Sequence, residues 1–217
     1  MGLEQIKTRI AGATAAAGRT PDGVTLIAVS KVQPTDRVRA VLDAGQRVFG
    51  ENYVQETQGK WPGWRAEYPG VSVHMIGPLQ TNKAKLAFDL FDAIHTLDRE
   101  SLLAKLARLA DQAGRCPDLF VQVNTGAEAQ KAGISPADLD GFMRQVRDSG
   151  LRPRGLMCIP PDGADPVPHF RQLRQMAEVH GLPDLSMGMS ADFEAAIAEG
   201  ATFVRVGSAI FGARDYT

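Results

Sequence analysis

Residues 25–50, TLIAVSKVQPTDRVRAVLDAGQRVFG, contain the pattern that decides the fold. A short apolar run at 25–30 is followed by an amphipathic stretch at 36–44, and a second short apolar run lies at 47–50. Short apolar runs bounded by turn residues predict buried strands, whereas the longer amphipathic stretch predicts a helix. The segment therefore predicts a strand, a helix and a second strand, which is the repeating unit of a parallel sheet.

The same alternation continues to the end of the chain. Further apolar runs predict strands at 71–76, 93–96, 119–124, 154–159, 185–189 and 202–206. Amphipathic stretches predict helices at 54–58 and onward, 82–89, 100–113, 136–148, 168–180 and 192–199. Glycine follows many of these helices where a helix commonly ends, at Gly45, Gly114, Gly150, Gly181 and Gly200.

Eight such units predict a closed (β/α)8 barrel of the TIM type, because an open doubly wound sheet usually has only about five or six strands. An extra helix at 3–17 precedes the first strand and is expected to cap the bottom of the barrel. Ser135 and Pro136 are expected to open the helix at 136–148 as its cap and first-turn residues. No linker divides the chain, so residues 1–217 are predicted to form a single domain.

Composition excludes several classes of function. Lys and Arg total 24 against 25 Asp and Glu, and this balance argues against nucleic acid or an anionic membrane as a partner. The chain has no run of ~18 apolar residues that could span a membrane. Cys116 and Cys158 lack the spacing of a zinc site or a redox motif, so we expect both to be reduced and buried in a cytoplasmic protein.

Active sites of barrels of this type form beyond the carboxyl ends of the strands. Lys31 follows the most apolar predicted strand, where its amine would point into the mouth of the barrel. Burial there would lower the pKa of the amine, and a neutral amine can attack a carbonyl to form a Schiff base. An ordinary solvated lysine at the end of a strand is the alternative.

The last predicted strand leads into RVGSAIFG at 205–212, a turn suited to an anion. Gly207 lets the backbone approach closely, Ser208 adds a hydroxyl, and Ser190 offers a second hydroxyl after the preceding strand. Barrels often bind phosphate between the loops after these two strands. A tight turn at Gly207 and a plain helix cap at Ser190 are the alternatives.

Arg205 lies on the same predicted strand face as Phe203 and Gly207. A buried arginine needs a partner, and two interpretations stay open: an ion pair with an acid such as Glu51, or a donor that faces a ring nitrogen of a ligand.

An amine, a phosphate cradle and an arginine facing a heteroaromatic nitrogen are together the features that hold pyridoxal 5′-phosphate (PLP).

Motifs in order along nearly the whole chain carry a resemblance to a known family. They are AVSK at 28–31 with Pro34, FGENYVQE at 49–56, HMIGPLQTNK at 74–83, Val123-Asn124 with KAG at 131–133, GLM at 155–157, LSMGMS at 185–190 with Asp192, and RVGSAIFG at 205–212. With these motifs the chain resembles the YggS/PROSC family of PLP-binding homeostasis proteins, which are single barrels similar to the N-terminal domain of alanine racemase.

The resemblance implies that Lys31 forms the Schiff base, Asn52 lies beside the cofactor ring and Arg205 faces the pyridine nitrogen. It implies no catalytic residue and no metal ligand. The departures from the family pattern are mild: Ser208 replaces a common Thr, Val32-Gln33 replace Thr-Lys, and Met75 replaces Phe. The complete set of implied cofactor-binding residues is Lys31, Asn52, Met187, Ser190, Arg205, Gly207 and Ser208.

The function implied is a carrier or regulator of PLP in intracellular PLP homeostasis. A guanidinium only donates, so Arg205 would leave the ring nitrogen unprotonated and the ring a weak electron sink. Racemases with such an arginine use a tyrosine from an added C-terminal domain, and we expect no such domain here, because the chain ends at Thr217. A weak amino-acid racemase is the alternative within the same fold.

Two alternatives from other classes stay open. A metal-dependent barrel hydrolase would use His74, His95, Glu51 and Asp98, although the chain lacks an H-x-H pair. A non-catalytic interaction module with a vestigial barrel would take up no PLP.

The expected partners are PLP and PLP-dependent apoenzymes, and the expected state is a monomer. Trp61 and Trp64, with Pro62 between them, are expected in a loop that covers a hydrophobic edge.

Overall fold

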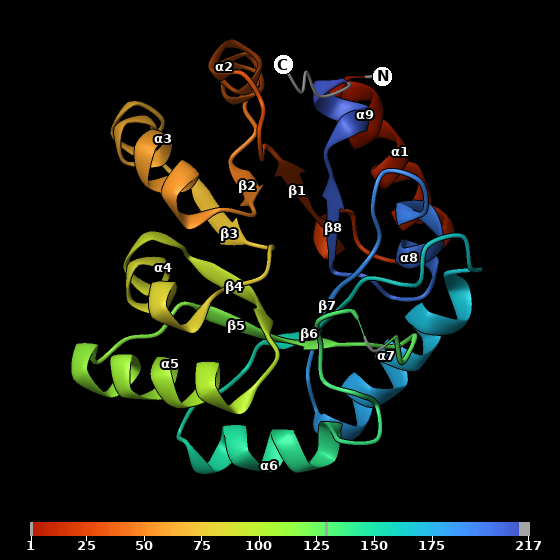
Figure 1. Cartoon of the computed structure of the whole chain (residues 1–217). Helices are drawn as coiled ribbons and strands as arrows, with labels where there is room; N and C mark the ends of the chain where they lie inside the picture. The colour runs from red at the N-terminus through yellow and green to blue at the C-terminus, as the bar shows by residue number, and fades with distance from the viewer. Residues whose placement is uncertain (1, 129, 213–217) are drawn as a thin grey trace.

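The computed structural model describes residues 2–128 and 130–212. Within them, every strand pairs in parallel with the next, and β8 pairs with β1, so the sheet closes into a barrel (Figure 1). The predicted (β/α)8 barrel is therefore confirmed. The strands are β1 (Thr25–Val29), β2 (Val48–Glu51), β3 (Ser72–Met75), β4 (Ala93–Leu97), β5 (Asp118–Val123), β6 (Gly155–Cys158), β7 (Asp184–Ser186) and β8 (Phe203–Val206).

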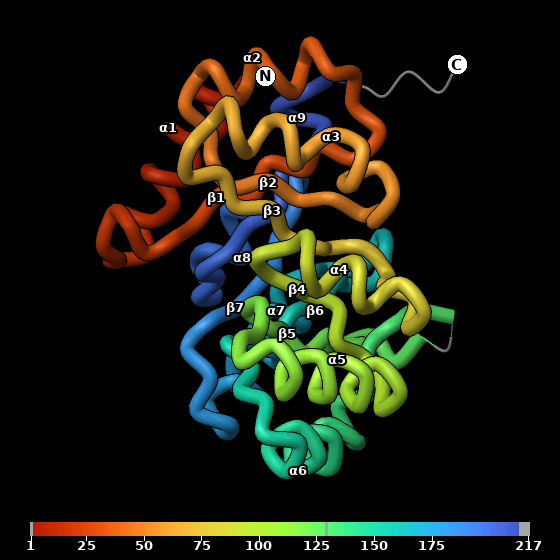
Figure 2. The backbone as a smooth tube through the Cα atoms, turned by 90° about the vertical axis from the view of Figure 1, so that its left-hand side faces the viewer, coloured from red at the N-terminus to blue at the C-terminus, as the bar shows by residue number. Residues whose placement is uncertain are grey.

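The helices form an outer layer around the ring of strands, as Figure 1 and Figure 2 show from two directions. No helix in the described part of the chain is long and apolar enough to cross a membrane. The helices are α1 (Leu3–Ala16), α2 (Thr35–Asp43), α3 (Val54–Glu67), α4 (Ala84–Leu90), α5 (Glu100–Ala113), α6 (Leu139–Asp148), α7 (Val167–His180), α8 (Phe193–Ala198) and α9 (Ser208–Phe211), with 3₁₀ turns at Pro21–Gly23 and Thr81–Lys83.

The glycines predicted to end helices all have positive φ, with values from 62° to 102°. At Gly114 and Gly181, the residue directly after α5 and α7 adopts the left-handed conformation that glycine reaches without strain. These helix ends are thus encoded locally, which explains why they could be predicted.

Two predicted helix positions were wrong. Helix α1 does not cap the bottom of the barrel but packs in the outer layer against α8 and α9 (Figure 1). Arg9 of α1 donates to both carboxylate oxygens of Glu194 in α8, at 2.9 and 2.8 Å, which ties the two helices together. Helix α6 begins at Leu139 rather than at Pro136. Ser135 Oγ does accept the Asp138 N–H at 3.2 Å, the bond expected of a cap, but these residues form a turn that precedes the helix.

The expectation that the two tryptophans lie in a loop was also wrong. Both belong to α3, which contains Pro62 in its interior. Trp61 is completely buried, and its ring packs on Phe49 of β2 with centroids 4.9 Å apart. The burial of this large ring offsets the hydrogen bond that a proline removes from a helix.

The cysteines differ from each other. Both are free, but Cys116 is exposed while Cys158 is buried in β6, so the expectation of burial was wrong for Cys116. Cys116 follows α5 in the link to β5, on the surface of the molecule.

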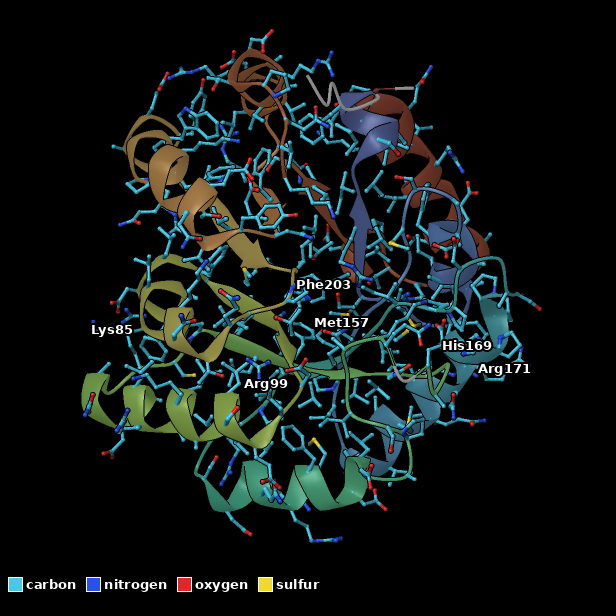
Figure 3. The ribbon with its side chains drawn as sticks, viewed as in Figure 1. Lys85, Arg99, Met157, His169, Arg171 and Phe203 are labelled. Atoms are coloured by element: carbon cyan, nitrogen blue, oxygen red, sulfur yellow. The ribbon has the colours of Figure 1, made fainter. Side chains whose placement is uncertain are left out.

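Inside the ring of strands lies a small apolar cluster that is separate from the large core between strands and helices. It consists of Ile27, Phe120, Met157 and Phe203. Figure 3 shows Met157 and Phe203 toward the middle of the ring, whereas Lys85 and Arg171 lie at its periphery. This cluster closes the barrel below the side chains at its carboxyl end, so the barrel is not an open pore.

Replacing Gly155 by Ala is expected to destabilise the barrel strongly. A Cβ at Gly155 would lie 2.0 Å from the backbone oxygen of Asp184, its partner across the β6–β7 pairing. We expect a loss of about 3 kcal/mol in the free energy of unfolding, measured by urea denaturation. Gly12→Ala, at an open position in α1, is the control and should gain about 0.5–1 kcal/mol. A loss at Gly155 no larger than the change at Gly12 would contradict this packing.

Candidate functional site

A cavity of about 310 Å³ opens at the carboxyl ends of the strands. It brings together all of the predicted cofactor-binding residues except Met187. Its lining is Val29, Lys31, Asn52, Ile76, Ile159, Met189, Ser190, Ala191, Arg205, Gly207 and Ser208. The apolar members Ile76, Ile159 and Met189 were not predicted, because single apolar residues after strands give no signal of their own.

Met187 lies elsewhere. Its side chain is fully buried in the large core outside the barrel and does not line the cavity. Side chains alternate between the two sides of a strand, and Ser186 at the end of β7 points to the interior. The side chain of the next residue therefore points to the helices.

Lys31 follows β1 in a turn and is half-buried. The residue before it is anchored in two ways: the Ser30 N–H donates to Gly50 O at 3.0 Å, and Ser30 Oγ donates to Glu51 Oε1 at 2.8 Å. The position of Lys31 at the rim of the cavity thus follows from the pairing of β1 with β2.

Two hydroxyls and a glycine form the predicted anion cradle between the last two strand ends. Ser190 Oγ accepts the Gly207 N–H at 3.4 Å and lies 3.5 Å from Ser208 Oγ. A Cβ at Gly207 would lie 3.3 Å from both the Cβ and the backbone oxygen of Val29, a tight contact that glycine avoids where the chain leaves β8 beside the end of β1. The predicted proximity of these three residues is therefore observed.

Asn52 lies at the edge of the same cavity, and its position depends on close packing. A Cβ at Gly77 would lie 2.6 Å from the Cα and the backbone oxygen of Asn52. The Oδ1 atom of Asn52 is buried and has no hydrogen-bond partner among the described residues. A buried acceptor without a partner costs free energy unless a ligand supplies a donor.

Arg205 does not form an ion pair with Glu51, which was one of the two roles considered for it. It is 5% exposed, its Nη1 donates to Ser186 Oγ at 2.8 Å, and its Nη2 donates to Cys158 O at 2.9 Å. Burial lowers the pKa of the guanidinium from its ordinary value, but an arginine stays charged at neutral pH. The side chain is therefore a fixed cationic donor at the floor of the cavity.

Behind Arg205, hydrogen bonds continue across the barrel interior. His95 Nδ1 lies 2.8 Å from Ser186 Oγ, His74 Nδ1 lies 3.0 Å from His95 Nε2, and Ser72 Oγ lies 3.0 Å from His74 Nε2. Ser186 accepts from the guanidinium, so its own hydroxyl can donate to His95 Nδ1, and each histidine then donates from Nε2 to the next group. Burial lowers the pKa of His74 to about 4 and that of His95 well below its ordinary value, so both are neutral.

Glu51 is a completely buried carboxyl group under the Lys31 turn. Its Oε1 accepts from Ser30 Oγ and, at 3.0 Å, from Trp61 Nε1, while its Oε2 has no partner among the described residues. Burial raises the pKa of Glu51 to about 7, against the hydrogen bonds from Ser30 and Trp61, which lower it. The carboxyl group is thus poised between its neutral and charged forms near pH 7.

Replacing Glu51 by Gln should change how stability depends on pH. The pKa of Glu51 is about 7 in the folded protein, above its ordinary value of 4.5. Between these values the folded state holds a proton that the unfolded state lacks, so a rise in pH destabilises the native protein. Glutamine cannot ionise, so Glu51→Gln should gain roughly 3 kcal/mol relative to the native protein as the pH rises from about 4.5 to about 7.

Urea denaturation at a series of pH values measures this difference. The opposite pH effect of His74, whose pKa is lowered, is present in both proteins and cancels in the comparison. A difference that stays constant with pH would show that folding does not raise the pKa of Glu51.

The histidines and acids of the hydrolase alternative do not converge. His74 and His95 bond to each other inside the barrel, Glu51 bonds to Ser30 and Trp61, and Asp98 pairs with Arg99 at 2.6 Å. Among residues 2–128 and 130–212, no group of three or more His, Cys, Asp or Glu residues is placed to hold a metal ion.

Comparison with known proteins identifies the family. The family model described as "Alanine racemase, N-terminal domain" matches residues 3–215. The pyridoxal phosphate homeostasis protein of Escherichia coli K12 is 43% identical over 99% of this chain and 96% of its own length. That of Pseudomonas aeruginosa is 42% identical over 99% and 95%.

Solved structures agree with this result. PipY of Synechococcus elongatus, in the structure with PLP bound, is 40% identical, with a TM-score of 0.80 over 94% of this chain and 100% of that chain. Alanine racemase from Acinetobacter baumannii, at 16% identity and a TM-score of 0.64 over 94% of this chain and 56% of that chain, shares the fold. The chain therefore belongs to the alanine racemase N-terminal domain family, in the group of its members that contains the pyridoxal phosphate homeostasis proteins.

Proposed function

We propose that this chain binds PLP reversibly through Lys31 and serves as a carrier or regulator in PLP homeostasis. The observation that carries the proposal is the convergence of Lys31, Arg205 and the Ser190–Ser208 pair on one cavity of about 310 Å³. The relatives named pyridoxal phosphate homeostasis protein, and the PLP-bound structure of PipY, support the same function.

The residues present fit this cofactor. The donor set offers an amine, a cationic donor and two hydroxyls, and the unpartnered Oδ1 of Asn52 can accept from a polar atom of the ligand. When bound, PLP supplies an aldehyde that forms a Schiff base with an amine, and a ring that can withdraw electrons. In this proposal Lys31 holds the aldehyde carbon, Gly207 and Ser208 hold the phosphate with Ser190, and Arg205 donates to the pyridine nitrogen.

The lining of the cavity favours binding over turnover. Within the described part of the chain, Lys31 is the only residue of the lining whose side chain has an amine, a carboxylate, an imidazole or a phenol, the groups that commonly move protons in catalysis. Tyr53 is 54% exposed and outside the lining, and the Tyr68 hydroxyl donates to Asp43 on the surface at 2.8 Å. Tyr216 lies outside the described residues. A second group that moves a proton on the opposite face of a substrate, as racemisation needs, is not among the residues that line the cavity.

Residues 1–217 act as one PLP-binding domain, the protein is a monomer in the cytoplasm, and PLP-dependent apoenzymes receive its cofactor.

Borohydride reduction of the PLP-loaded protein, followed by peptide mass mapping, tests this function. We expect a pyridoxyl group on Lys31. A reproducible adduct on another lysine would overturn the site, and steady turnover of an L-amino acid in a coupled assay would favour the racemase alternative.

A further inference from the structure

The turn that carries Lys31 is strained. The Gln33 N–H donates to Ser30 O at 3.2 Å, which places Lys31 and Val32 at the centre of a four-residue turn. Val32 has φ of 55°, a conformation that costs free energy for a β-branched residue. Its side chain is 42% exposed, so burial in the core does not hold it there. Something else must stabilise the turn.

Glu56 of α3 contacts the strained residue directly. Its Oε1 accepts the Val32 N–H at 2.8 Å. The same carboxylate pairs with Lys60 one helical turn later, and Lys60 Nζ donates to Gln33 O at 3.4 Å. Glu56 and Lys60 thus hold two successive residues of the turn, one through its N–H and the other through its carbonyl.

Glu56 occupies a position at which glutamate commonly caps the N-terminus of its own helix. Glu56 is the third residue of α3, the position from which a glutamate can reach back and satisfy the N–H that precedes its own helix. Helix α3 has no side-chain cap of this kind. The carboxylate is instead committed to the turn after β1, on a different element of the barrel.

We propose that Glu56 is a positioning residue for Lys31. By holding Val32 at positive φ it keeps the Lys31 amine directed at the cavity, where the hydroxyls of Ser190 and Ser208 hold the other end of the ligand. Ser30 is fixed on the opposite side of Lys31 by Gly50 and Glu51, so Glu56 completes the support. The inference rests on the proposed function, because it concerns capture of PLP by this lysine.

The test distinguishes an effect on the position of the Lys31 amine from an effect on phosphate binding by Ser190, Gly207 and Ser208. Glu56→Ala should capture PLP about tenfold more slowly, since local backbone strain of this kind is worth one or more factors of ten. Capture is followed by absorbance and by borohydride trapping on Lys31. Binding of pyridoxine 5′-phosphate, which has an alcohol in place of the aldehyde, should be unchanged. Equal losses for both ligands would reduce Glu56 to a structural residue and overturn the proposal.

Two further variants show whether slow capture in Glu56→Ala comes from the conformation of the turn or from general destabilisation of the fold. Glycine adopts positive φ without strain, so Val32→Gly combined with Glu56→Ala should restore fast capture. Glu56→Gln keeps an oxygen that accepts the Val32 N–H and should remain close to the native rate. A double variant as slow as Glu56→Ala would overturn the proposal.

Glu67→Ala is the matched control on the same helix, because Glu67 pairs with Arg39 at 2.6 Å, away from the turn. It should leave capture unchanged. If the native protein traps PLP on Lys31 at the same rate as Glu56→Ala, only the role of Glu56 fails. If the native protein does not trap PLP on Lys31, the proposed function itself fails.

Discussion

Lys31→Ala is expected to lose covalent capture of PLP completely while retaining the barrel. Lys31 is the only lysine of the cavity lining in the described part of the chain, so no other amine there can replace it. It is half-buried in a turn outside β1, and its loss removes no strand pairing. Because the cradle at Ser190, Gly207 and Ser208 is untouched, we expect non-covalent binding of pyridoxine 5′-phosphate to persist.

Intact-mass measurement after borohydride reduction checks this expectation. Lys83→Ala is the control, since Lys83 donates to Gln55 at 3.0 Å and does not line the cavity. It should trap PLP like the native protein. A full adduct in Lys31→Ala would show that another residue captures the aldehyde.

Arg205→Glu is expected to give the second large effect, a changed absorption spectrum of the bound cofactor with the adduct on Lys31 retained. The substitution changes the charge at a nearly fully buried position by two units and replaces a donor by an acceptor. A carboxylate at this position would hold a proton on the pyridine nitrogen, whereas in the proposed function the guanidinium would leave the nitrogen unprotonated. Absorbance and fluorescence of the loaded protein over a pH series measure the difference.

Arg205→Met distinguishes the effect of losing the guanidinium donor from the effect of gaining a carboxylate acceptor. Methionine neither donates to nor accepts from the ring, so its spectrum should differ from that of Arg205→Glu. Both variants leave Cys158 O and Ser186 without the guanidinium donor, so both should lose some stability. A spectrum of Arg205→Glu that matches the native one would show that Arg205 does not contact the ring.

The features that could be predicted from the sequence are those encoded by neighbouring residues. Strand positions follow from short apolar runs, and the helix ends at Gly114 and Gly181 follow from a conformation that suits glycine. The cavity residues Lys31, Ser190 and Gly207 could be brought together because strand ends meet at one side of a parallel barrel. Each of these inferences needs only local pattern and topology.

The features that were missed depend on contacts between distant segments. Pro62 signalled a loop, but the burial of Trp61 against Phe49 of β2 keeps the segment helical. Arg205 finds its partners in Ser186 of β7 and a backbone oxygen of β6, and a backbone acceptor has no signature in the sequence. Met187 was placed in the site by resemblance, but the alternation along β7 directs its side chain to the core.

The role of Glu56 could not be predicted either, because it too depends on a contact between distant segments. The motif FGENYVQE suggested that this segment matters but not how. Only the structure shows that a first-turn carboxylate of α3 reaches the N–H of Val32, 24 residues earlier in the chain.

The pairing of β1 with β8 also has a consequence for self-association. Residues Thr25 to Ala28 match Phe203 to Val206 in register, so the first and last strands protect each other. Within the described part of the chain the sheet has no free edge onto which a strand of another molecule could add. Fibre growth by strand addition would first require the barrel to open between β8 and β1. Resistance to aggregation should therefore increase with the stability of the β1–β8 pairing.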